Sequence, residues 1–160
     1  MSRVKRSILA AFRALLHPFE QREIPFIKRE ITLVAQVLSE RDRALLSRLA
    51  DEHQWALHFA RSSAEIWEVL NQRKAQIVLF EREAPDAHWR ELIREVASGP
   101  RLVCAILISD VTDDNLWNEV VLWGGHEVLV TPLREENVLR AIRLAWLYWN
   151  SAMKNNAGAA

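Results

Sequence analysis

This 160-residue chain has little cysteine, little glycine and no excess of charge of either sign. Each of these absences excludes a class of protein. The single cysteine, Cys104, lies in the apolar run LVCAILI and has no partner for an internal disulfide, which indicates a buried thiol in a reducing cytoplasm. Four glycines are too few for a glycine-rich phosphate loop. Basic and acidic residues number 21 each, so the basic excess typical of a nucleic-acid binder is missing.

The sequence also lacks a long hydrophobic run and a recognisable catalytic motif. The start MSRVKR resembles the charged beginning of a signal peptide, but the apolar stretch ILAAF that follows is short and is interrupted by Arg13. Five histidines are scattered without the spacing of a metal site or a neighbouring cysteine pair. We therefore expect a cytoplasmic, non-enzymatic protein that uses no cofactor, no metal and no nucleic acid.

Residues 1–30 differ from the rest of the chain in charge. They hold seven basic and three acidic groups, whereas the remainder has 14 basic and 18 acidic groups. The pattern over residues 3 to about 17 predicts an amphipathic helix whose apolar side consists of Val4, Ile8, Phe12, Leu15 and Leu16. A linker with two prolines follows. We expect this helix to dock on protein, because its apolar side has one aromatic residue and no tryptophan; a membrane-associated adaptor is the alternative.

From Ile31 onward, short apolar runs alternate with helical periodicity. This alternation predicts an α/β domain over residues 31–153, with a parallel sheet covered by helices on both faces, and a disordered tail over residues 154–160. The expected strands are 31–37, 55–60, 75–80, 102–108 and 127–131, and the expected helices are 39–52, 62–73, 86–98, 112–123 and 134 to about 153.

Glu81 directly follows the apolar residues of the third predicted strand, in the segment IVLFEREAP. Ligands of open parallel sheets bind beyond the carboxyl ends of the strands, so the position of this carboxylate suggests a site. Two later segments, LISD and LVTPL, end the fourth and fifth strands at the same edge. Together the three segments, within Ile31 to about Trp149, resemble the receiver domain of two-component response regulators.

The resemblance implies a flavodoxin-like sheet in the order 2-1-3-4-5 and a place in a signalling phosphorelay. It also implies protein partners such as a histidine kinase or another regulator. Glu81 stands where the family has its phospho-accepting aspartate, and Ser109 stands where it has a switch serine or threonine. In the family, the fourth helix, fifth strand and fifth helix form the surface for dimerisation and output.

Four other positions depart from the family pattern. Val37 and Leu38 replace the acidic pair that holds Mg²⁺, Thr131 replaces the lysine that senses the phosphate, and Val128 replaces the aromatic switch residue. Phosphoryl transfer depends on positioning and on neutralising charge, and Mg²⁺ needs several hard oxygen ligands. These losses predict a pseudo-receiver that acts without phosphorylation; an atypical phospho-accepting receiver is the alternative.

Two roles remain open for Glu81 in a pseudo-receiver. Its longer carboxylate could imitate a phosphorylated aspartate by hydrogen-bonding to Ser109, or it could be a solvated remnant of a decayed site. A metal cluster of Glu81 with Glu83, Asp86 and Asp110 is a third and weaker hypothesis, because neighbouring acidic residues in loops are usually solvated.

Seven tryptophans are many for 160 residues, and four of them lie in the last two predicted helices. The final helix is apolar around most of its circumference, although a helix on one face of a sheet buries a single stripe. Aromatic side chains are enriched in interface hot spots. We therefore expect a homodimer whose interface comprises Trp117, Trp123, Leu144, Leu147 and Tyr148.

Overall fold

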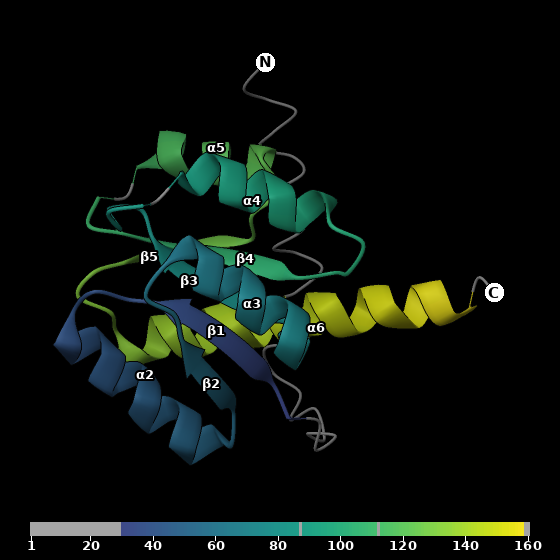
Figure 1. The fold of residues 1–160 in the computed structure, drawn as a ribbon, viewed down its shortest axis with the longest axis horizontal. Coiled ribbons are helices and arrows are strands. Elements are labelled where there is room, and N and C mark those ends of the chain that lie inside the picture. The colour runs from purple at the N-terminus through teal and green to yellow at the C-terminus, as the bar shows by residue number, and fades with distance from the viewer. Residues whose placement is uncertain (1–29, 87, 112, 159–160) are drawn as a thin grey trace.

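The computed structural model describes residues 30–86, 88–111 and 113–158. The amphipathic helix predicted over residues 3–17 and the linker after it lie outside these residues. The described chain forms five strands and five helices in strict alternation (Figure 1). They are β1 Thr32–Gln36, α2 Glu40–His53, β2 Ala56–Phe59, α3 Ser63–Arg73, β3 Ile77–Glu81, α4 Trp89–Ser98, β4 Cys104–Ser109, α5 Asp114–Leu122, β5 Glu127–Val130 and α6 Glu135–Gly158.

The strands form one parallel sheet in the order β2-β1-β3-β4-β5, which confirms the predicted fold class. β1 lies between β2 and β3, with Val34 opposite His58 on one side and Val78 on the other. β4 continues the sheet from β3, and β5 forms the second edge. Because all strands are parallel, their carboxyl ends meet at a single edge of the sheet.

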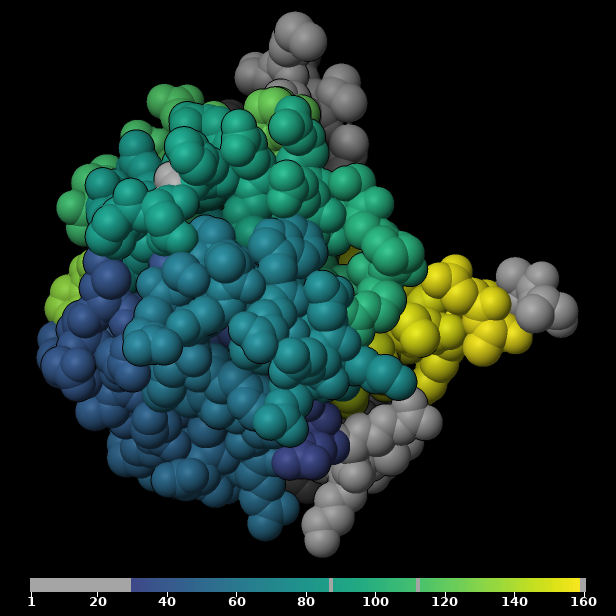
Figure 2. Space-filling view, viewed as in Figure 1, coloured from purple at the N-terminus to yellow at the C-terminus, as the bar shows by residue number. Residues whose placement is uncertain are grey.

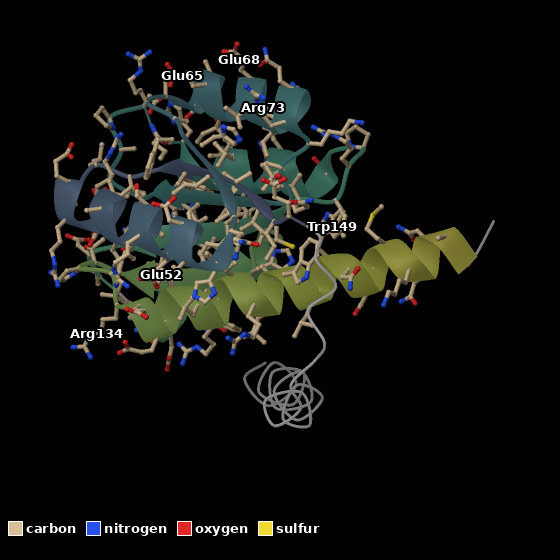
Figure 3. The ribbon with its side chains drawn as sticks, turned by 90° about the horizontal axis from the view of Figure 1, so that it is seen from below. Glu52, Glu65, Glu68, Arg73, Arg134 and Trp149 are labelled. Carbon is tan, nitrogen blue, oxygen red and sulfur yellow. The ribbon has the colours of Figure 1, made fainter. Side chains whose placement is uncertain are left out.

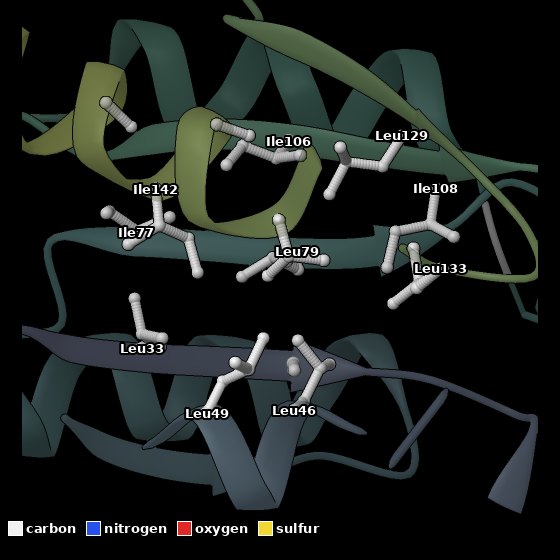
Figure 4. Close-up of a cluster of buried hydrophobic side chains, with 14 of the residues drawn as sticks. Leu33, Leu46, Leu49, Ile77, Leu79, Ile106, Ile108, Leu129, Leu133 and Ile142 are labelled. Carbon is white, nitrogen blue, oxygen red and sulfur yellow. The ribbon is translucent and has the colours of Figure 1, made fainter. Parts of the chain in front are cut away.

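The sheet has a hydrophobic layer on each face because successive strand residues point to opposite sides. On one face, strand residues pack against α2 and α6 (Figure 4). On the other face they pack against α3, α4 and α5. Central strands are buried on both faces, so β3 and β4 read as continuous apolar runs instead of alternating ones.

Helix starts follow the polar residues that precede them. Side-chain oxygens of Ser39, Ser62 and Asp113 accept hydrogen bonds from backbone N–H groups in the first turns of α2, α3 and α5. The predicted capping box before α3 is present in a modified form, in which the Glu65 carboxylate accepts the backbone N–H of Arg61. After α5, Gly124 has φ of 99°, a left-handed conformation that favours glycine at a helix end.

α6 is longer than the sequence pattern predicted. It continues through Gly158, so residues 154–158 are helical where we expected a disordered tail. Its first half lies against the sheet, and its carboxyl end projects beyond the rest of the molecule (Figures 1 and 2). Trp149 lies on the side of α6 that faces the sheet (Figure 3), where its indole Nε1 donates a hydrogen bond to the Leu102 carbonyl at 2.9 Å. Among the described residues, no helix has the length and apolarity needed to span a membrane.

Cys104 occupies the start of β4 and is fully buried. Its neighbours in the core are the aliphatic side chains under α6, and its thiol lies 3.5 Å from the Ala145 carbonyl. Burial raises the pKa of this thiol to about 12, because the surroundings do not solvate a thiolate. The thiol is therefore protonated and inert in the folded protein.

Candidate functional site at the carboxyl end of the sheet

Glu81 is the last residue of β3, and it points into the edge of the sheet instead of into solvent. Its side chain is 9% exposed. One carboxylate oxygen, Oε1, accepts the backbone N–H of Leu38 at 2.8 Å. Because β1 and β3 are neighbours, this hydrogen bond ties the end of β3 to the loop that joins β1 to α2. Glu81 is thus a partner for the backbone of that loop.

The two positions that replace the metal-binding acids face opposite environments. Val37 is 2% exposed and belongs to the hydrophobic layer under α2 and α6. Leu38 is 51% exposed at the rim of the sheet edge. Neither side chain has an oxygen to offer, and the described residues contain no group of three or more His, Cys, Asp or Glu side chains that could hold a metal ion. The side chains at this edge do not fit the Mg²⁺ that phosphoryl transfer requires.

The residues at the switch positions, Ser109, Thr131 and Val128, contact neighbouring parts of the chain. Ser109 is buried, and its hydroxyl oxygen accepts the backbone N–H of Val111 at 3.2 Å. The backbone N–H of Thr131 donates to the Ser109 carbonyl at 3.0 Å, and Val128 lies in the hydrophobic layer under α3, α4 and α5. Within the described part of the chain, no hydrogen bond joins Glu81 to Ser109. The structure therefore lacks the contact on which the phosphate-mimic hypothesis depends, and it places Glu81 in a role that neither sequence hypothesis included.

Asp86, which we considered as a metal ligand, holds two loops together. Its Oδ1 accepts a hydrogen bond from Gln36 Nε2 at 3.0 Å, and its Oδ2 accepts the backbone N–H of Ser63 at 2.7 Å. These hydrogen bonds, that from Ser63 foremost, hold the pKa of Asp86 below its ordinary value. Gln36 is buried at the end of β1, and sequence reasoning missed it. The signal was present, because Gln36 is the one polar side chain between Leu33 and Leu38.

Asp42 is the second residue that sequence reasoning missed. It is 1% exposed in the first turn of α2, and its Oδ1 accepts the backbone N–H of Leu133 at 3.0 Å. Its position four and seven residues before Leu46 and Leu49 puts it on the buried face of the helix, a signal that periodicity alone could have supplied. Through this contact the start of α2 is linked to the loop between β5 and α6.

Together, the acidic side chains of this edge act as acceptors for backbone and amide N–H groups. Glu81 binds the β1–α2 loop, Asp86 binds the β2–α3 loop, and Asp42 binds the β5–α6 loop. Glu81 and Asp42 are buried, and a buried acceptor paired in this way stabilises its loop, since an unpaired backbone N–H in such a place costs about 1–3 kcal/mol. The arrangement fixes the loops at this edge to their neighbours.

The predicted interface residues fall into two groups in the structure. Trp117 and Trp123 of α5 are half-buried against the layer beneath that helix. The Trp117 indole Nε1 donates to Glu127 at 3.1 Å, and the Arg94 guanidinium lies 5.8 Å from the centre of the Trp123 ring. Both tryptophans thus have intramolecular partners.

On α6, Leu144 and Leu147 are half-buried, whereas Tyr148 is 41% exposed. The Tyr148 ring packs edge-on against His126, at 4.7 Å between ring centres. Burial lowers the pKa of His126 to about 4, so this imidazole is neutral at pH 7. Exposed apolar side chains at the end of α5 extend the same region: Val121 and Leu122. We call the surface formed by these residues and Tyr148 the α5–β5–α6 surface.

Comparison with known proteins finds similarity in fold. No protein-family model matches the sequence, and no curated protein matches it either. Among solved structures, the signal receiver domain of an HD domain-containing protein from Pseudomonas fluorescens Pf-5 is 21% identical with a TM-score of 0.63, over 77% of this chain and 99% of that one. A response regulator from Thermotoga maritima is 15% identical with a TM-score of 0.66, over 73% and 98% of the two chains.

The chemotaxis response regulator CheY4 of Vibrio cholerae is 14% identical with a TM-score of 0.65, over 73% of this chain and 99% of that one. In each case nearly the whole of the known receiver superposes on the described domain. The order β2-β1-β3-β4-β5 agrees with the order that the sequence resemblance implied. The chain therefore has the fold of a response-regulator receiver domain.

Proposed function

We propose that this chain is a signalling module with a receiver fold that acts through protein contacts and independently of phosphorylation. The observation that carries this proposal is the hydrogen bond from the Leu38 N–H to Glu81, which gives the residue at the acceptor position a structural partner. A carboxylate in this role is already engaged by the protein. The proposal assigns no catalytic activity to the chain.

The surroundings of Glu81 support the same proposal. The transferred phosphoryl group carries negative charge that metal ions and a lysine usually neutralise. Here Val37 is part of the core, and the residue after β5 is Thr131, which has no charge. A phosphoryl group at Glu81 would also share the edge with the carboxylates of Asp86 and Asp110. Charge repulsion that neither a metal ion nor a lysine after β5 offsets disfavours the reaction.

The partners that this proposal requires are proteins of a two-component pathway, such as a histidine kinase or another regulator, in the cytoplasm. A second copy of the chain is the first partner that the surface suggests. The α5–β5–α6 surface exposes Val121, Leu122 and Tyr148, with Leu144 and Leu147 partly accessible on the same helix as Tyr148. Large apolar side chains gathered on one surface favour a protein contact.

Acetyl phosphate treatment with Mg²⁺ tests the independence from phosphorylation. We expect intact-mass measurement to show no phosphate adduct, while a phosphorylatable receiver in the same reaction serves as the positive control. Glu81→Gln is the matched variant, and circular dichroism checks that it keeps the fold. A stoichiometric adduct that disappears in Glu81→Gln would show that the chain is an atypical phospho-accepting receiver instead.

A further inference from the structure

The charge of the described domain is concentrated at the carboxyl end of the sheet. This end comprises the five loops after the strands and the first turn of each following helix, residues 37–43, 60–66, 82–92, 110–117 and 131–138. They contain eleven carboxylates and six guanidinium groups, a balance of −5. The other residues from 31 to 160 contain seven carboxylates and eight basic groups, a balance of +1. The net charge of −4 over residues 31–160 therefore comes entirely from the carboxyl end of the sheet.

Several of these carboxylates are free to attract a cationic partner. Glu65 pairs with Arg61, Glu135 pairs with Arg48, and Glu83 lies 3.6 Å from Arg82. Asp42 and Asp86 are engaged by the loops that they bind. The remaining carboxylates make no ion pair with other described residues, and with the exception of the Asp113 helix cap they also lack a hydrogen-bonding role: Glu40, Glu91, Asp110, Asp113, Asp114 and Glu136.

The same end exposes a row of apolar side chains. Leu38 is 51% exposed, Val111 is 52% exposed and Val130 is 37% exposed. They follow or end β1, β4 and β5, and the strand order places them across the sheet edge at intervals set by a strand spacing of about 4.8 Å. The hydrogen bonds from Leu38 to Glu81 and from Val111 to Ser109 fix two of them to the edge. An apolar row within an acidic surface fits a basic, amphipathic segment.

We propose that residues 3–17 of this same chain dock on the carboxyl end of the sheet, with their apolar side on Leu38, Val111 and Val130. Residues 1–30 carry a net +4, opposite in sign and similar in size to the charge of the acidic end. The apolar side of the predicted helix includes Ile8 and Phe12, and Arg3, Lys5, Arg6 and Arg13 lie elsewhere on it. Both apolar contact and charge therefore match the surface.

The length of the intervening chain permits this docking within one molecule. The described structure begins beside Ile31, at the amino end of β1, where the Ile31 carbonyl accepts the Ala56 N–H. The five residues of β1 rise by about 17 Å from that end of the sheet to the other. Residues 18–29 extend up to about 40 Å when straight, which is enough to return along the molecule. Docking at this edge would therefore be an intramolecular contact of the chain with its own domain.

Amide hydrogen exchange on the full-length protein, read by mass spectrometry, tests the proposal. We expect residues 3–17 to exchange about tenfold or more slowly than an unstructured segment, at a rate independent of protein concentration. The double variant Leu38→Lys and Val111→Lys should abolish this protection, because it places two charged side chains in the apolar row and lowers the charge of the acidic end from −5 to −3. The control Met153→Lys with Asn155→Lys adds the same charge at exposed positions on the projecting end of α6 and should leave the protection unchanged.

Salt supplies a second readout, since about 0.5 M NaCl screens charge over a few ångströms and should accelerate exchange in residues 3–17. Exchange at the unstructured rate in the wild-type protein would overturn the proposal. Equal loss of protection in both double variants would overturn it too, as would protection that grows with protein concentration, which would indicate a second copy. Protection that arises only with vesicles of anionic phosphatidylglycerol would assign the segment to a membrane surface instead. None of these outcomes depends on whether Glu81 accepts a phosphoryl group.

Discussion

At the scale of single residues, Glu81 stands at the phospho-acceptor position of a receiver fold and accepts a hydrogen bond from the backbone. The end of β1 leaves the Leu38 N–H without a partner in the sheet, and the longer side chain of a glutamate reaches it from β3 at 2.8 Å. Asp86 and Asp42 serve the neighbouring loops in the same way. The three acidic residues thus stabilise the loops at the edge where a ligand site would otherwise form.

Replacing Glu81 tests this structural role. We expect Glu81→Ala to lower the free energy of unfolding by about 1–3 kcal/mol, because the Leu38 N–H loses its acceptor in a largely buried place. Glu81→Gln keeps an acceptor oxygen and should cost less than Glu81→Ala. Urea denaturation measures both, with Glu83→Ala as the control at an exposed neighbouring carboxylate that should change stability by less than about 0.5 kcal/mol. Equal losses for Ala and Gln would mean that the charge itself matters more than the acceptor.

The sequence indicated the positions of the residues at the strand ends better than it indicated their partners. Glu81, Ser109 and Thr131 could be placed at the carboxyl ends of strands because apolar runs mark where strands end. The hydrogen bonds of Glu81 and Asp42 join segments 43 or more residues apart, Leu38 with Glu81 and Asp42 with Leu133. Such contacts depend on the register of the whole sheet, which local patterns do not encode.

At the scale of elements, the alternation of apolar runs and helical periodicity was sufficient to predict all five strands and five helices of the described domain. Their ends were less predictable, and α6 shows why. The segment NNAGAA has no apolar stripe, so the pattern predicted that the helix would stop near Met153. Helices also extend by propagation from a stable packed portion, since each added residue gains one backbone hydrogen bond. The packing of Ile142, Ala145 and Trp149 supplies that stable portion.

This explanation predicts a gradient of stability along α6. Amides from about Val138 to Trp149 should exchange slowly, because opening them requires separating the helix from the sheet. Amides of residues 152–158 should exchange close to the unprotected rate, since their side chains are mostly exposed and gain nothing from packing. Amide exchange followed by NMR at each position measures the gradient. Strong protection as far as Gly158 would contradict it and would indicate that another surface covers the projecting end.

At the scale of the whole molecule, the tryptophans contribute less exposed apolar surface than their number suggested. Trp117 binds Glu127, Trp149 binds the Leu102 carbonyl, and Trp146 stacks on Trp149 with 5.3 Å between ring centres. The apolar side chains that remain exposed on the α5–β5–α6 surface are aliphatic, apart from Tyr148. Composition revealed the excess of aromatic residues, but it could not distinguish aromatic residues that complete a core from those left for a partner.

Self-association through this surface remains a prediction. We expect sedimentation velocity of the full-length protein to show a dimer, because a two-fold contact would cover Leu122 and Tyr148 of both copies. Leu122→Asp with Tyr148→Asp should give a folded monomer, since each dimer would then bury four unpaired carboxylates. Met153→Asp, at the far end of α6, should leave the dimer intact. A monomeric wild-type protein would show that these side chains are tolerated in water.

Because Cys104 is buried, the rate at which a reagent labels its thiol can measure how often the molecule opens. The thiol is the only one in the sequence, lies at the start of a central strand, and is shielded by α6. A thiol reagent reaches it only in molecules whose α6 has left the sheet. When reclosing is faster than labelling, the labelling rate divided by that of a free thiol equals the fraction of molecules open at any moment. A single mass shift, followed over hours in native buffer, therefore reports how often this fold opens, without denaturant and without a change in the sequence.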